Sequence, residues 1–210
     1  MTSTSPTTTQ DADFYQHNGY IRYEHFFAVG EIAGLHQAID HAIDTRRARI
    51  KGAADDGRSS ADYERVFNQM VNLWTDYPDA KQIAFHERLA ESARRLSGCR
   101  YVRIYHDHAM IKPPGQTSKE TNWHQDAPYW PMDPVGALSA WIAVDDVTPD
   151  NGCLHFVPGT HKFERLEPIK LGVDGESIVD KMRERGYEVP EPVTMDMAAG
   201  GVTFKAFKER

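Results

Sequence analysis

The sequence predicts an α+β domain in which helices come first and several short strands of a sandwich or barrel follow. Up to Gly98, apolar residues recur at helical spacing, with one short strand between helices. After Gly98, short runs of β-type residues alternate with Pro and Gly turns, which is typical of a strand-rich core. The 210 residues are enough for one domain with a sizeable core, and no internal repeat is visible.

Helices are expected in three parts of the first half. The first begins at Asp11 or Asp13 as N-cap, runs through His17, and ends at Asn18-Gly19, before a short strand at 20–23. The second covers 31–47, with isoleucines and a leucine on one stripe, and an exposed loop at 51–62 follows it. The third starts near Pro78 and runs to about residue 96, with room for a break near Phe85.

Six strands are expected after Gly98. They cover residues 100–111, 123–129, 137–146, 153–157, 193–195 and 202–204. Between the third and fourth, Asn151-Gly152 is a turn signal that needs a positive φ. Asp145-Asp146 could suggest a two-carboxylate hydrolase, but at a strand end they are expected to hold a turn.

Composition excludes several classes of protein. Charged residues make up 26% and the formal net charge is -7, so there is no basic surface for nucleic acid. No run of about 18 apolar residues could cross a membrane. Residues 1–10 form a polar Ser/Thr run without the features of a signal peptide and are expected to be disordered, which leaves 11–210 as a single domain. Cys99 and Cys153 are too few for a disulfide framework, so a reducing cytoplasm is expected.

The chemistry of the chain is concentrated in Trp123-His124-Gln125-Asp126. On a strand, residues two apart point to the same face, so His124 and Asp126 would converge on one point. An imidazole and a carboxylate are two thirds of the 2-His-1-carboxylate triad that binds Fe(II). With 10 histidines, one such spacing is roughly what chance gives, so the pair alone does not separate a metal site from a surface His beside a turn Asp.

The neighbouring motifs decide between these readings. Lys112-Pro113-Pro114-Gly115 precedes the pair, and the downstream segments read WIAVDD at 141–146, Asn151-Gly152, and VPGTH at 157–161. In this order they resemble the phytanoyl-CoA dioxygenase family of Fe(II)/2-oxoglutarate-dependent oxygenases, over about residues 100–204. The Asn-Gly-Tyr at 18–20 and the helix after it also fit that family.

The resemblance implies a fold, cofactors and site residues. The fold is a double-stranded β-helix, a jelly-roll or cupin-like barrel, with the N-terminal helices packed on one side. The cofactors are Fe(II), 2-oxoglutarate as co-substrate, and O2. His124 and Asp126 match two iron ligands, and Lys112 matches a position that can pair with a carboxylate of 2-oxoglutarate. Trp141 and Gln125 match residues near the co-substrate, although Trp141 could be plain core and Gln125 would point away from its neighbours on an ideal strand.

Three further features have two readings each. His106 and His108 share a face of an expected strand; His108 is a candidate for the co-substrate pocket, but either could be an ordinary strand histidine. Tyr129 and Trp130 either border the substrate or cover the core. His161 is expected in a structural corner rather than at the metal.

The end of the sequence departs from the family pattern. The family has a second iron-binding His on a late strand and, beyond it, an Arg that anchors 2-oxoglutarate, whereas no histidine follows His161 here. After Phe204 the chain reads KAFKER, which suggests a truncated or frame-shifted gene or a shortened chain without the final strands. His106 or His108 could replace the missing ligand only if the strand order placed them beside His124.

The resulting expectation is a dioxygenase that hydroxylates an unactivated C–H bond of a small molecule and releases succinate and CO2. The alternatives are an inactive relative or binding module of the same fold and, less well supported, a zinc hydrolase. Neither the substrate nor the oligomeric state can be read from the sequence.

Overall fold

The computed structural model describes residues 6–53, 68–111, 121–131, 136–169 and 177–207, and side chains within these ranges except at 46–53 and 68–69. Its helices and strands lie in this order along the chain: α1 (Thr9–Asn18), β1 (Tyr20–Tyr23), α2 (Val29–Ala53), β2 (Asn68–Val71), α4 (Pro78–Ala84), α5 (Glu87–Ser97), β3 (His108–Ile111), β4 (Leu138–Ile142), β5 (Leu154–Phe156), α6 (Ile178–Glu184), β6 (Val193–Met195) and β7 (Val202–Ala206). Three short 3-10 helices, η2 (Leu73–Thr75), η3 (Ala127–Tyr129) and η4 (Thr160–Lys162), lie between them.

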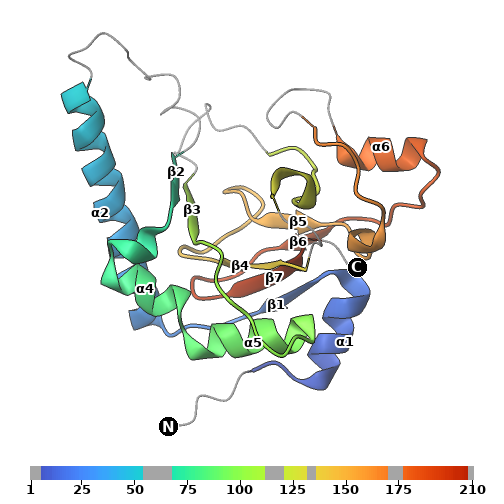
Figure 1. Cartoon of the computed structure of the whole chain (residues 1–210), viewed down its shortest axis with the longest axis horizontal. Coiled ribbons are helices and arrows are strands. Elements are labelled where there is room, and N and C mark those ends of the chain that lie inside the picture. The colour runs from blue at the N-terminus through green and yellow to red at the C-terminus, as the bar shows by residue number, and fades with distance from the viewer. Residues whose placement is uncertain (1–5, 54–67, 112–120, 132–135, 170–176, 208–210) are drawn as a thin grey trace.

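A three-stranded antiparallel sheet with the order β1-β7-β4 lies at the centre (Figure 1). Its register places Phe204 of β7 opposite Ile21 of β1 and Ala140 of β4, and Lys205 opposite Tyr20 and Ser139. Two separate two-stranded sheets, β5-β6 and β2-β3, complete the described strands. Because directly opposite residues share a face, the central sheet has one face with Phe204 and another with Lys205.

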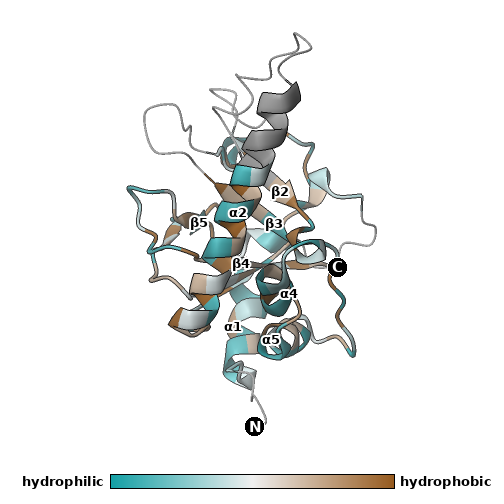
Figure 2. Cartoon of the chain, turned by 90° about the vertical axis from the view of Figure 1, so that its left-hand side faces the viewer, coloured by the Kyte–Doolittle hydropathy of each residue, from teal (hydrophilic) through white to brown (hydrophobic). Residues whose placement is uncertain are grey.

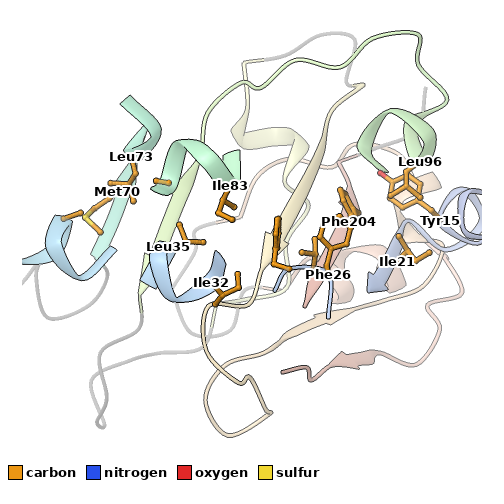
Figure 3. Packing of buried hydrophobic residues seen from close by; sticks show 14 residues of the cluster. Tyr15, Ile21, Phe26, Ile32, Leu35, Met70, Leu73, Ile83, Leu96 and Phe204 are labelled. Carbon is orange, nitrogen blue, oxygen red and sulfur yellow. The ribbon is translucent and has the colours of Figure 1, made fainter. Parts of the chain in front are cut away.

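The helices cover the Phe204 face of this sheet. Phe204 and Val202 are completely buried there, together with Leu96 of α5 and Phe26 after β1. Figure 3 shows Phe26 beside Phe204, and Leu96 beside Tyr15 of α1. This is the main hydrophobic core, and its burial attaches the helical layer to the sheet.

The opposite, inner face of the sheet is covered by β5 and β6. Tyr20 stacks on Phe156 of β5 with ring centroids 5.1 Å apart, and the buried Met195 of β6 belongs to the same cluster. A third cluster joins α6 to the segment after β5 through buried residues such as Leu166 and Ile178. The fold is therefore a jelly-roll-type barrel with helices packed on one side, as expected.

Several elements of the first half follow the predicted pattern. The strand at Tyr20–Tyr23 has the predicted bounds, and α4 and α5 are separated by a break at Phe85 and His86. The second helix is longer than expected and runs to Ala53; the rest of the expected loop at 51–62 lies outside the described residues. In Figure 2 the coloured part of α2 carries both brown and teal segments, as an amphipathic helix should.

The predicted start of α1 was wrong. Thr8 is the N-cap, and Asp11 is the third helical residue whose carboxylate accepts a hydrogen bond from the Thr8 backbone N–H. Thr7 is buried, with its hydroxyl 2.9 Å from the Tyr23 hydroxyl. Order therefore begins before residue 10, because this polar segment caps a helix and fills a site against β1 and α5, where Arg95 donates to the Thr7 carbonyl.

Several strand predictions also need correction. The expected strand at 100–111 is regular only at His108–Ile111, and the expected strand at 123–129 pairs with no other described strand and ends in η3. Asp126 has helical φ and ψ of -70° and -36°, and Pro128 lies within the first two residues of η3, so the chain turns instead of extending. The pattern also missed β2 and α6.

Among the described residues, no helix combines the length and the apolar character needed to cross a membrane. Cys99 and Cys153 are both free thiols.

Candidate metal centre

The side chains of residues 123–126 point alternately to two sides, although this segment pairs with no other described strand. Trp123 packs against the third cluster, and its carbonyl accepts a hydrogen bond from the N–H of Ile178 at 3.0 Å. The amide of Gln125 binds backbone on the same side, donating to the Glu164 carbonyl at 3.0 Å and accepting from the Leu166 N–H at 2.9 Å. These contacts leave His124 and Asp126 on the other side, facing β7.

His124 and Asp126 converge as the sequence predicted, although the geometry has a different cause. His124 Nε2 lies 3.2 Å from Asp126 Oδ1. The other ring nitrogen, Nδ1, lies 2.7 Å from the Asn122 carbonyl oxygen, which fixes the orientation of the ring. The two residues meet because the chain turns into η3 at Asp126, where Tyr129 N–H donates to the Asp126 carbonyl at 3.0 Å.

A third residue, Lys205 of β7, completes the cluster. Its Nζ lies 2.5 Å from Asp126 Oδ2. One carboxylate oxygen of Asp126 therefore contacts the imidazole of His124, and the other contacts the ammonium of Lys205. Lys205 shares the inner face of the sheet with Tyr20 and Ser139, and its side chain is 23% exposed. Lys205 and Ala206 belong to β7, which extends two residues beyond the strand expected at 202–204.

The carboxyl group of Asp126 is the electrostatic centre of this cluster. Burial alone would raise its pKa, but the hydrogen bond with His124 and the ammonium of Lys205 lower the pKa to about 2. Asp126 is therefore an anion at neutral pH despite a side chain that is only 17% exposed. A buried carboxylate beside an imidazole is a suitable donor set for a divalent metal.

The geometry fits two neighbouring positions on one metal ion. Two donor atoms each about 2.1 Å from a metal, at roughly a right angle, are about 3 Å apart. The 3.2 Å between His124 Nε2 and Asp126 Oδ1 agrees with this separation. Within the part of the chain that the structure describes, no group of three His, Cys, Asp or Glu side chains could hold a metal, so neither His106 nor His108 is placed as the third ligand.

A group of aromatic rings gathers around Trp130, four residues after Asp126. Trp130, directly after η3, lies 4.7 Å from the ring of His106 and 5.8 Å from Tyr105, measured between ring centroids. Phe207, just past β7, lies 5.9 Å from the same indole. The partial burial of His106 lowers its pKa, which favours the neutral ring. These rings border the segment that carries Asp126.

The other predicted site residues lie in different surroundings. Lys112 is outside the described residues. Trp141 of β4 lies opposite Thr203 on the inner face and packs against the cluster around Met195. His108 begins β3, its ring centroid is 6.0 Å from that of His106, and burial together with His106 lowers its pKa. The co-substrate role of Trp141, Gln125 and His108 stays a prediction.

Two structural readings are confirmed. Asp146 Oδ1 accepts a hydrogen bond from the Ala199 N–H at 2.8 Å, and Asn151 bonds to the Thr148 N–H and the Asp146 carbonyl, so this region holds a turn. His161 lies in a corner against the end of α1, with Nε2 3.2 Å from the Gln16 carbonyl oxygen. Tyr129 also has a structural contact, since its hydroxyl donates to the Ile169 carbonyl at 2.7 Å.

Sequence reasoning missed Lys205 and Phe207. A weak signal was present, because Thr203, Lys205 and Phe207 alternate with Val202, Phe204 and Ala206 across the expected strand. A lysine within such a run is unusual unless its charge has a partner. The register of β7 between β1 and β4 directs Lys205 to the inner face, where its partner is Asp126.

Comparison with known proteins places this geometry in context. The model of the family described as phytanoyl-CoA dioxygenase matches residues 15–206. Phytanoyl-CoA dioxygenase of Arabidopsis thaliana is 24% identical, over 96% of this chain and 81% of its own length. Ectoine dioxygenase of Bordetella parapertussis is 28% identical over 90% of this chain, which spans 61% of the length of that protein.

Solved structures agree on the fold. The non-haem α-ketoglutarate-dependent carbocyclase SnoK of nogalamycin biosynthesis has a TM-score of 0.73 at 23% identity, covering 98% of this chain and 78% of that one. The S. alaskensis EctD structure with 2-oxoglutarate and 5-hydroxyectoine has a TM-score of 0.70 at 24% identity, covering 99% and 70%. Another structure of the same EctD contains bound Fe.

Proposed function

Because the chain belongs to the phytanoyl-CoA dioxygenase family of non-haem Fe(II)/2-oxoglutarate-dependent enzymes, we propose that it hydroxylates an unactivated C–H bond of a small molecule. The observation that carries the proposal is the 3.2 Å approach of His124 Nε2 and Asp126 Oδ1 inside the barrel. In this proposal both residues are iron ligands. The single domain at 11–210 is part of the same proposal.

Each protein group has a defined task in this reaction. Bound Fe(II), with 2-oxoglutarate and O2, would supply the oxidation in which one oxygen atom enters succinate, CO2 leaves, and the other oxygen becomes the substrate hydroxyl. His124 would hold the metal through Nε2, with its ring fixed by the Asn122 carbonyl. Asp126 would bind as a carboxylate, which its pKa of about 2 supports.

The remaining site residues would position the two organic reactants. Lys112 and Trp141 are proposed to contact 2-oxoglutarate, with Gln125 and His108 as weaker candidates for the same pocket. The rings of Tyr105, His106 and Phe207 gather around Trp130, four residues after Asp126, and in this proposal they would exclude water from the side where a substrate approaches.

The test is an anaerobic titration of the full chain with Fe(II) and 2-oxoglutarate, followed by addition of O2 and measurement of succinate. The expected result is the charge-transfer absorption of an iron-bound 2-oxoglutarate, and succinate formation on exposure to O2. His124→Ala and Asp126→Ala should abolish both signals. His155→Ala and Asp150→Ala, at exposed residues outside the cluster, are the matched controls and should retain both.

A second candidate is a binding module of the same fold without turnover. It is favoured by Lys205, whose ammonium contacts Asp126, and by the lack of a third metal-ligating side chain near the pair among the described residues. Binding of 2-oxoglutarate without succinate, in a protein with an intact fold, would support it. The zinc hydrolase alternative gains no support from the described residues, because it also needs a third ligand.

A further inference from the structure

Lys205 contacts Asp126, the carboxylate ligand of the proposed iron site. Its Nζ is 2.5 Å from Asp126 Oδ2, a short charge-assisted contact between two side chains that are both less than a quarter exposed. Because both side chains are largely buried, the ammonium stabilises the negative charge of Asp126 where few water molecules can solvate it.

The position of Lys205 is fixed by the fold rather than by chance on a surface. It lies in the middle strand of the central sheet, and its neighbours across the sheet are Tyr20 and Ser139. Phe204, the preceding residue, is completely buried in the helix-covered core and anchors the strand. The lysine therefore points to the inner face in every molecule that has this register.

A metal ion bound to His124 Nε2 and Asp126 Oδ1 would be close to this ammonium. The two oxygens of one carboxylate are only about 2 Å apart, so a divalent cation and the ammonium would share a single anion at short range. Like charges at that distance repel, and the shared carboxylate cannot neutralise both. Tight metal binding therefore requires the Lys205 side chain to withdraw from Asp126.

We propose that Lys205 is an internal competitor for the metal site: its ammonium occupies Asp126, and divalent metal binds only as the lysine side chain moves away. The inference rests on the proposed function, in which His124 and Asp126 are the ligands. The apparent affinity for metal is then reduced by the fraction of molecules in which the carboxylate is available. Removing the ammonium while keeping the length of the side chain raises this affinity.

The experiment compares Co(II) binding to the full chain and to Lys205→Met, anaerobically, at one pH and one ionic strength, from the visible absorption of bound Co(II). We expect Lys205→Met to bind Co(II) at least about tenfold more tightly. Lys205→Arg retains the positive charge and should remain weak. Lys162→Met, at an exposed lysine of η4, is the matched control and should equal the unmodified protein.

A second measurement does not depend on the absorption band. Lys205→Met should melt at a lower temperature than the unmodified protein without metal, because Asp126 loses its cation, and Co(II) should raise its melting temperature by more. If Lys205→Met does not fold, Lys205→Gln is used in both measurements.

The outcomes separate this inference from the proposed function. Equal or weaker Co(II) binding by Lys205→Met, with a band that still depends on His124, overturns the competition alone. A loss of 2-oxoglutarate affinity in Lys205→Met with unchanged Co(II) affinity also overturns it and makes Lys205 a co-substrate contact. No binding, or binding that survives His124→Ala in the Lys205→Met protein, overturns the ligand assignment and the competition together.

Discussion

A single carboxylate, Asp126, joins two distant parts of the chain. One oxygen contacts His124, two residues earlier. The other contacts Lys205 on β7, the last described strand. The local contact depends on a turn, whereas the distant one depends on the register of a sheet. A change at this residue therefore affects both.

Gly19 shows a different constraint at the scale of one residue. It ends α1 with φ of +82°, and a Cβ added there would lie 2.4 Å from His161 Nδ1. Gly19→Ala should lower the free energy of unfolding by roughly 2 to 3 kcal/mol, because it adds a clash to left-handed strain. Urea denaturation measures the change.

Gly98→Ala is the matched control for Gly19→Ala. Gly98 also has a positive φ, +63°, but a Cβ there would meet nothing within 4 Å. It should cost only the strain, about 1 kcal/mol. Equal losses at the two positions would show that the contact with His161 does not matter.

Gln125 tests whether a residue between the proposed ligands is structural. Its amide binds the backbone of Glu164 and Leu166, so Gln125→Ala would leave a part-buried N–H without this partner. The expected loss is about 1 to 3 kcal/mol in urea denaturation, with the 2-oxoglutarate affinity of the Co(II)-loaded protein unchanged. Gln82→Ala, on the exposed side of α4, should change neither quantity. A weaker 2-oxoglutarate affinity with unchanged stability would instead place Gln125 at the pocket.

At the scale of elements, we expect substitutions on the two faces of β7 to have different effects on stability. Phe204→Ala should lower the free energy of unfolding by about 3 to 5 kcal/mol, because it opens a cavity in the helix-covered core.

Its neighbour Thr203 is equally buried, but its hydroxyl has no hydrogen-bond partner among the described residues. Thr203→Val should therefore be neutral or stabilise by up to about 1 kcal/mol. Urea denaturation of both variants decides; a loss above about 1 kcal/mol in Thr203→Val would reveal a partner for the hydroxyl.

The burial of Tyr23 of β1 should make stability depend on alkaline pH. Burial raises the pKa of Tyr23 from 10.0 to about 12, although its hydrogen bond to Thr7 opposes the shift. Because the pKa of Tyr23 is higher in the folded protein than in the unfolded chain, the neutral hydroxyl contributes fully to the free energy of unfolding below about pH 10. This contribution is lost as the pH rises from 10 towards 12. The melting temperature of the unmodified protein should therefore fall more steeply over this range than that of Tyr23→Phe. Parallel curves would contradict the expected ionisation.

At the scale of the whole molecule, the sequence predicted most of the fold and the approach of His124 to Asp126, but not the contact of Lys205 with Asp126. The strand at Tyr20–Tyr23 was predictable because Asn18-Gly19 ends the preceding helix, and the break between α4 and α5 follows from the local pattern. His124 and Asp126 were predictable because ordered motifs surround them. The strand assigned to 123–129 failed because tertiary contacts, rather than a neighbouring strand, hold this segment.

Lys205 could not be predicted for a physical reason. A lone lysine normally remains in water, and only its strand neighbours show that this one is directed inward. Strand order is a property of the entire chain, which local periodicity does not contain. The strand β2 was missed in a similar way, since its four residues form a strand by pairing with β3.

The pairing of β1 with β7 also has a consequence for how the protein forms. Tyr20 lies opposite Lys205, so this ladder closes a loop that contains almost all of the described chain. Contacts of such high sequence separation slow folding, because the entropy of loop closure is lost before the contacts form. During synthesis on the ribosome, β1 cannot pair with β7 until residues 202–206 have emerged. The candidate metal centre is thus among the last features to assemble, and the helical layer can form well before any chemistry is possible.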